Sequence, residues 1–102
     1  MALSKKELAI VAEIDRCADK ICALGDRIFE NPELGYKEFD TSAEMKAAFE
    51  GLSLFVADNL AVTGISATVG DGKDFRLAIM GELDSVICPT HKKAKATGEA
   101  HA

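Results

Sequence analysis

The chain has 102 residues, of which 48% are hydrophobic and 28% charged, and its net charge at pH 7 is −5. This length and composition predict one globular domain and argue against a disordered or fibrous protein. The negative charge disfavours nucleic acid or an anionic membrane as partner, because both select a basic surface. No apolar run of about 20 residues and no secretory segment is visible, so we expect a cytoplasmic protein with no membrane partner. Three cysteines form an odd set that disfavours a disulfide framework.

The first predicted element is a long helix that begins after Ser4 and ends before Pro32. Ser4 and Glu7 have the spacing of a capping box. Apolar residues recur at helical spacing in Leu8, Val11, Ile14, Ile21, Leu24 and Ile28. We expect this stripe to be buried, with Cys17 and Cys22 in or beside the core.

A second helix is predicted from about Asp40 to Glu50. Thr41 and Glu44 have the spacing of another capping box, and Gly51 stands where a helix commonly ends on a left-handed residue. Its buried face would be formed by Met45, Ala48, Phe49 and Leu52.

The pattern then changes to strands. Residues 65–69 alternate between apolar and polar, which predicts a half-buried strand, and a shorter strand is expected at about 54–57. Residues 70–74 are typical of a hairpin turn, and the apolar run 75–80 predicts a central strand in which Ile79 is buried. The expected fold is therefore α/β, with two N-terminal helices packed on a sheet of two or three strands.

Four segments in order carry a resemblance to a known family. They are Arg27-Ile-Phe-Glu-Asn-Pro-Glu-Leu-Gly-Tyr-Lys-Glu-Phe-Asp-Thr41, Thr63-Gly64, Gly81-Glu-Leu-Asp-Ser-Val86 and Gly98-Glu-Ala-His-Ala102. Together they resemble the N-terminal region of M20 amidohydrolases, which include aminoacylase-like, hippurate and aminobenzoyl-glutamate hydrolases. Phe29 stands where many relatives have histidine, which is nearer the aminobenzoyl-glutamate branch. The resemblance implies that residues 1–102 are the first part of one catalytic domain, without its remainder or the lid domain.

The resemblance also implies a function. M20 enzymes use a divalent metal, zinc or manganese, to hydrolyse an amide in an N-acyl amino acid or peptide-like small molecule. In relatives a Cys-Gly-His segment with metal ligands follows the pair that is His101-Ala102 here. We therefore expect no metal bound by this segment alone and no catalysis by it. A small-molecule amide is the expected substrate of the whole enzyme, and a homo-oligomer is a further expectation.

Two carboxylates are the candidate site residues. Glu82 and Asp84 are two residues apart after an apolar run, so their side chains would leave a strand on the same face. Ligands of open α/β sheets bind beyond the carboxyl ends of strands, although a solvated acidic strand end is the alternative. Relatives carry His-x-Asp here, which implies that Asp84 supports the metal site and that Glu82 replaces a ligand.

A second metal-like pattern is weaker. Cys88 and His91 have the Cys-x-x-His spacing of half a zinc site, and Glu99 and His101 are the nearest further donors. Four scattered donors in a polar tail predict no zinc site. A different functional class also stays open, in which the chain is a non-catalytic module that binds a protein partner through an exposed sheet edge.

Overall fold

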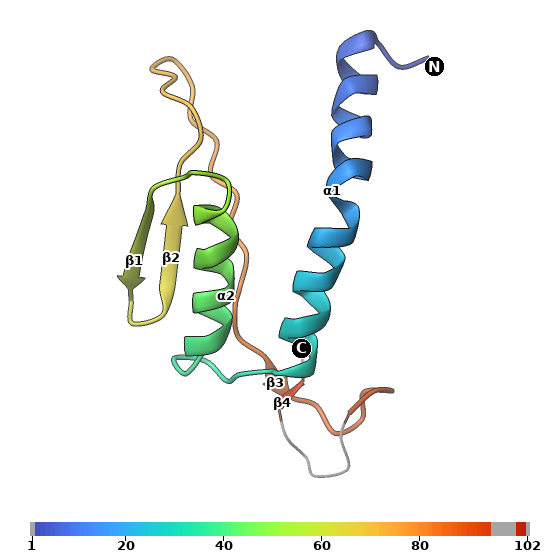
Figure 1. Cartoon of the computed structure of the whole chain (residues 1–102). Coiled ribbons are helices and arrows are strands. Elements are labelled where there is room, and N and C mark those ends of the chain that lie inside the picture. The colour runs from blue at the N-terminus through green and yellow to red at the C-terminus, as the bar shows by residue number, and fades with distance from the viewer. Residues whose placement is uncertain (1, 95–99, 102) are drawn as a thin grey trace. The chain divides into compact units, whose positions relative to one another are not determined.

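The computed structural model describes residues 2–94 and the backbone of residues 100–101. The chain divides into two compact units, Met1–Glu30 and Asn31–Ala102 (Figure 1). The first unit is helical, and the second combines a helix with short antiparallel strands. The predicted α/β class, with two helices and a small sheet, is therefore confirmed. No helix in the described part of the chain is long and apolar enough to cross a membrane.

The first unit is helix α1, Lys5–Glu30. Its predicted capping box is present: the Ser4 amide donates to Glu7 Oε2 at 2.7 Å, and the Glu7 amide donates to Ser4 Oγ at 3.3 Å. Both bonds satisfy amides that a helix start would otherwise leave without an acceptor. One turn further on, Arg16 Nε donates to Glu13 Oε2 at 2.8 Å across the solvent-facing surface.

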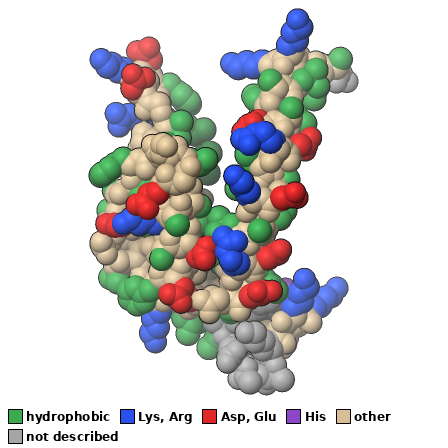
Figure 2. Space-filling model, viewed as in Figure 1, with side chains coloured by type: hydrophobic (Ala, Val, Ile, Leu, Met, Phe, Trp, Pro, Cys, Tyr) green, Lys and Arg blue, Asp and Glu red, His purple; other side chains and the backbone are tan. Residues whose placement is uncertain are grey.

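Most of the apolar stripe of α1 is exposed and its last members, Leu24 and Ile28, are half-buried, so the prediction that the stripe is buried was wrong. Ile14 is 62% exposed and Ile21 64%, Cys22 is exposed and Cys17 is half-buried. The amphipathic pattern correctly predicted the helix, but it does not show whether another element packs against the apolar stripe. The unit contains a single helix, so it has no second layer of its own against which the stripe could pack. Figure 2 shows hydrophobic side chains on the visible surface of α1 among the charged ones.

The second unit is built on a helix and a hairpin. Helix α2, Phe39–Glu50, contacts strands β1, Val56–Leu60, and β2, Gly64–Ala67. The two strands are antiparallel, with Val56 opposite Ala67 and Leu60 opposite Gly64. An ion pair between Lys46 on α2 and Asp58 on β1 links the helix to the hairpin. Further along, β3, Val86–Ile87, pairs with β4, Ala100–His101, in antiparallel register.

Helix α2 occupies nearly the predicted range, about Asp40 to Glu50, but the capping interactions at both ends differ from the expectation. The N-cap is Glu38, with no side-chain cap from Glu38 itself, and the expected Thr41–Glu44 capping box was wrong because the Thr41 amide donates to Glu33 instead. Gly51 has φ −62°, so it is not left-handed; its amide continues the helix by donating to Ala47 O at 2.9 Å. The left-handed residue comes later, at Ser53, with φ 59°.

The run 75–80 is not a strand, so the prediction of a central strand there was wrong. Among the described residues no strand pairing includes it, and Phe75 is 77% and Ile79 91% exposed. Gly70 has φ 78°, as a turn requires, yet the chain does not return along β2. A strand needs a neighbour for its backbone amides and carbonyls, and none of the described segments supplies one here.

The buried side chains in the described part of the chain are polar rather than apolar. No hydrophobic side chain in the described part of the chain is buried, whereas Glu38, Thr41, Thr63 and Ser85 are 3–7% exposed. Each of these four residues lies in one of the first three motif segments. Polar residues of the segments that carry the family resemblance are therefore the most deeply buried of the described residues in the second unit.

Candidate functional site

The loop of residues 31–38 organises the site through Glu33. Glu33 Oε1 accepts the Asp40 amide at 3.1 Å, and Glu33 Oε2 accepts the Thr41 amide at 2.7 Å. The carboxylate thus caps the first turn of α2 from outside the helix, where a negative charge is favourable. Burial by itself would raise the pKa of Glu33, but the hydrogen bonds from Thr41 and Asp40 outweigh it and lower the pKa.

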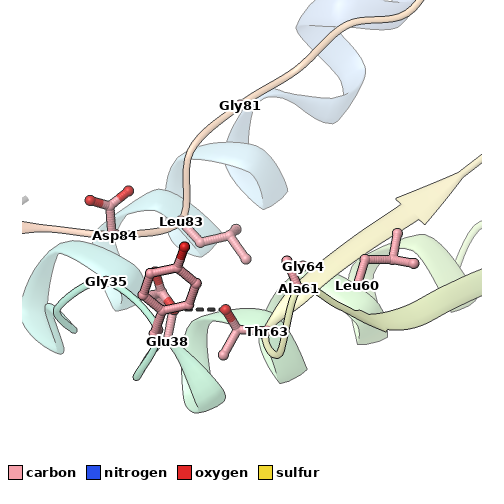
Figure 3. Close-up of a pocket in the computed structure, with 10 residues that line it drawn as sticks. Gly35, Glu38, Leu60, Ala61, Thr63, Gly64, Gly81, Leu83 and Asp84 are labelled. Carbon is pink, nitrogen blue, oxygen red and sulfur yellow. Dashed lines mark hydrogen bonds between the residues drawn. The ribbon is translucent and has the colours of Figure 1, made fainter.

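A second carboxylate joins the same loop to the β1–β2 turn. Thr63 Oγ1 donates to Glu38 Oε2 at 2.7 Å, and both residues are buried (Figure 3). This bond is the main reason that the pKa of Glu38 is lowered. The turn presents Thr63 through strained backbone: Ala61 has φ 47° and Val62 has φ 84°, a region that a β-branched residue rarely adopts. This strained backbone lies directly before Thr63, whose hydroxyl donates to Glu38.

The third motif segment reaches the loop through its backbone. Leu34 and Ser85 form a parallel bridge, and the Ser85 amide donates to Glu33 O at 2.7 Å. Ser85 is 5% exposed, so this contact is shielded from water. The bridge sets Asp84 beside the loop: a side-chain carbon on Gly35 would lie 4.0 Å from Asp84 Oδ2 and 3.9 Å from Glu38 Oε1. Gly35 is therefore flanked by two carboxylates.

These contacts surround an open pocket of about 370 Å³ (Figure 3). Its lining comes from the loop, the β1–β2 turn and the third motif segment: Gly35, Tyr36, Glu38, Leu60, Ala61, Thr63, Gly64, Gly81, Leu83 and Asp84. The lining combines the apolar side chains of Leu60, Ala61 and Leu83 with two carboxylates and the hydroxyls of Tyr36 and Thr63. Such a pocket can orient a polar small molecule beside an apolar group.

The structure separates the two candidate carboxylates of the sequence. Both residues are exposed, but Asp84 lines the pocket at its rim and Glu82 does not. The second carboxylate of the pocket lining is Glu38, a residue that the sequence did not single out. The only signal for Glu38 was its place in the long first motif, since nothing local pairs it with Thr63, 25 residues away.

Only Cys88 and His91 of the weaker metal pattern have described side chains. His91 Nδ1 accepts the Lys93 amide at 3.2 Å, and Cys88 Sγ lies 3.8 Å from Thr90 Oγ1. Glu99 and the side chain of His101 lie outside the described residues. Within the residues that are described, no three His, Cys, Asp or Glu side chains form a group that could hold a metal ion.

The chain is similar in sequence to several plant hydrolases. The chain is 30% identical over 101 residues to IAA-amino acid hydrolase ILR1-like 5 of Arabidopsis thaliana, which is 95% of this chain and 23% of that protein. It is 33% identical over 88 residues to ILR1-like 4 of the same plant, which is 82% of this chain and 20% of that protein. The chain thus spans less than a quarter of the length of these relatives.

No protein-family model matches the chain, and no solved structure matches it. The relatives are all amino acid conjugate hydrolases by name, and ILR1-like 2 of Arabidopsis thaliana adds a third, 30% identical over 80 residues that make up 74% of this chain and 18% of that protein. These matches span the motif segments that resemble M20 amidohydrolases, and the first three of those segments contribute residues to the pocket. The chain belongs to the M20 amidohydrolase family.

Proposed function

We propose that this chain is the N-terminal part of an M20 catalytic domain whose whole enzyme hydrolyses the amide bond of an N-acyl amino acid or peptide-like small molecule. The observation that carries the proposal is the convergence of three motif segments on one pocket, with Asp84 at its rim. The relatives are named IAA-amino acid hydrolases. Conjugates of an acyl group with an amino acid are therefore the substrate class proposed here, and the cytoplasm is the proposed location.

The described residues do not fit a metal site by themselves. The pocket offers two carboxylates, and Glu38 already accepts a hydrogen bond from Thr63. A hydrolytic zinc site needs about three protein ligands and an open position for water. We therefore assign no ligand and no chemical step to these residues, and we expect no hydrolysis by the chain alone. Zinc or manganese is part of the proposal only because M20 enzymes use a divalent metal.

Asp84 is proposed to act as a supporting carboxylate. Its backbone is fixed by the neighbouring Ser85 bridge, and its side chain lies beside Gly35 at the pocket rim. A carboxylate held in this way can orient a ligand-bearing side chain or a substrate amide, because its position does not depend on the substrate.

A fusion enzyme tests the proposal. Residues 1–102 would replace the matched segment of ILR1-like 5, and hydrolysis of an IAA-amino acid conjugate would be followed by release of the free amino acid. We expect the fusion to hydrolyse the conjugate in the presence of zinc or manganese, and a fusion that carries the segment with Gly64→Ala to be impaired through the Thr63 turn. A fusion that folds, binds metal and yet shows no amide hydrolysis would contradict the proposal.

A further inference from the structure

Tyr36 has an unusual position in the loop of residues 31–38. It lines the pocket, its backbone has φ 62°, and its side chain is 72% exposed. Left-handed backbone is unfavourable for a residue with a side-chain carbon, and it persists where the surrounding structure imposes it. An aromatic ring that is held in this way beside a pocket and left uncovered offers a large contact surface to a ligand.

Hydrogen bonds around Glu38 hold Tyr36 in this geometry. The Lys37 amide donates to Leu34 O at 3.0 Å and closes the turn, and the Thr63 hydroxyl donates to Glu38 Oε2 at 2.7 Å. The bond from Thr63 does most to lower the pKa of Glu38, and the backbone amides of Tyr36 and Lys37 contribute as well. The direction in which the Tyr36 side chain leaves the loop is therefore set before any ligand binds.

Apolar side chains line the same pocket as the Tyr36 ring. Leu83 is half-buried, and Figure 3 shows its side chain extending toward the β1–β2 turn, which contributes Ala61 to the lining. The pocket volume of about 370 Å³ lies in the range of sites that take small molecules. The ring and Leu83 thus form a surface that an apolar group of a ligand can cover.

The charges of the lining decide which end of a conjugate this surface receives. An N-acyl amino acid has a neutral acyl group at one end and a carboxylate at the other. Glu38 and Asp84 bring two carboxylates to the pocket, and no Lys, Arg or His is among the described residues that line it. A ligand carboxylate here would meet like charges without a cation to pair with. The acyl end is therefore the end that fits.

We infer that Tyr36 determines the acyl specificity of the site: its ring and Leu83 cover the apolar acyl group, while the amino-acid carboxylate points away from Glu38 and Asp84. The inference rests on the proposed function, and it names the residue that selects the substrate at the same site. The ring contributes contact area, so the phenol hydroxyl is not required for this role.

Binding to chain 1–102 tests the inference with three probes. N-phenylacetylglycinamide is neutral and has a bulky acyl group, N-phenylacetylglycine carries the carboxylate as well, and N-acetylglycinamide lacks the ring. NMR titrations would give the dissociation constants and identify the signals that shift. We expect both phenylacetyl probes to shift the signals of Tyr36 and Leu83, and to bind at least about fivefold more tightly than the acetyl probe.

Variants separate ligand contact from a structural role. Tyr36→Gly removes the ring and suits left-handed backbone, so it should fold as stably as the parent chain and yet bind the phenylacetyl probes at least about fivefold more weakly. Tyr36→Phe should keep the parental affinity. Phe55→Ala is the matched control: it removes an aromatic side chain that is 87% exposed and does not line the pocket, and it should leave the affinity unchanged.

Each result decides the inference. Parental affinity in Tyr36→Gly overturns it, as does absence of phenylacetyl binding. A carboxylate that changes the affinity of the phenylacetyl probe by more than about threefold overturns the orientation, because it would then lie within reach of the pocket charges.

The fusion enzyme judges the proposed function separately. Ring-dependent binding by the chain together with no amide hydrolysis by the fusion would support the inference and contradict the proposed function alone. A fusion that hydrolyses conjugates, and whose preference for phenylacetyl over acetyl substrates survives Tyr36→Gly, would overturn the inference and leave the proposed function standing.

Discussion

Gly64→Ala should destabilise the second unit through a specific collision. Gly64 lies opposite Leu60 in the β1–β2 pair, and a side-chain carbon at position 64 would lie 2.5 Å from Leu60 O and 3.3 Å from Leu60 Cβ. The first contact is with backbone, so no side-chain rotation can relieve it. The turn must open instead, and that turn carries Thr63 and its hydrogen bond to Glu38.

The magnitude follows from the cost of forcing an extra carbon into a filled site, about 1–3 kcal/mol. For a domain of 60–100 residues each kcal/mol lowers the melting temperature by about 4–8 °C, so Gly64→Ala should lower it by roughly 4–24 °C. Gly81→Ala is the matched control in the same unit, because a side-chain carbon there meets nothing within 4 Å. It should change the stability by no more than about 0.5 kcal/mol.

Thermal melts followed by circular dichroism, with the Thr63 hydroxyl and amide observed by NMR, would measure both effects. We expect the Thr63 signals to shift in Gly64→Ala and to stay in place in Gly81→Ala. Equal melting temperatures for Gly64→Ala and the parent chain would refute the close approach of Leu60 and Gly64, and with it the account of how the turn is built.

Three further predictions follow from the same geometry. Val62→Asn should stabilise the chain by about 0.5–1.5 kcal/mol in thermal melts, because asparagine tolerates the left-handed backbone that costs other residues about 1–2 kcal/mol; a lower melting temperature would contradict the strain at φ 84°. Glu33 and Glu38 have pKa values lowered from 4.5, so their contribution to stability is present above about pH 4.5 and is lost as the pH falls through the lowered values; urea unfolding should show a smaller free energy at pH 3 than at pH 6, and an unchanged value would count against both networks. In the fusion enzyme Asp84→Asn should lower amide hydrolysis or metal retention by about 10-fold to 100-fold while Asp71→Asn changes little; parental rates and full metal content in both variants would leave Asp84 without a role.

Local signals in the sequence predicted the helices well. The Ser4–Glu7 capping box and the residue before Pro32 are signals within a few residues of each end, and α1 runs between them as expected. The start of α2 was predicted to within one residue, but its capping interaction was wrong, because the cap comes from Glu33, eight residues before Thr41, through a loop that has no periodic pattern. Nothing in the spacing of Thr41 and Glu44 distinguishes a true capping box from a pair whose amide is already occupied.

Burial was predicted less well, because burial depends on what lies opposite a residue. The pattern at Ile14, Ile21 and Ile79 correctly describes side chains suited to an interior, but the described chain contains no layer that covers them. The candidate site shows the same contrast. Asp84 was selected because it follows the apolar run and lies in a family motif; it lines the pocket, and its supporting role stays a prediction. The bond between Glu38 and Thr63 joins segments 25 residues apart and leaves no local pattern.

Residue-by-residue hydrogen exchange of the chain, measured by NMR, tests most directly whether a polar framework holds the second unit while its apolar run 75–80 stays exposed. The amides of Thr41 and Ser85, each bonded to Glu33 at 2.7 Å, should be among the slowest of the second unit. The amides of Leu77 and Ile79 should exchange near the rate of an unstructured peptide. Slow exchange at Leu77 and Ile79 together with fast exchange at Thr41 and Ser85 would contradict the account.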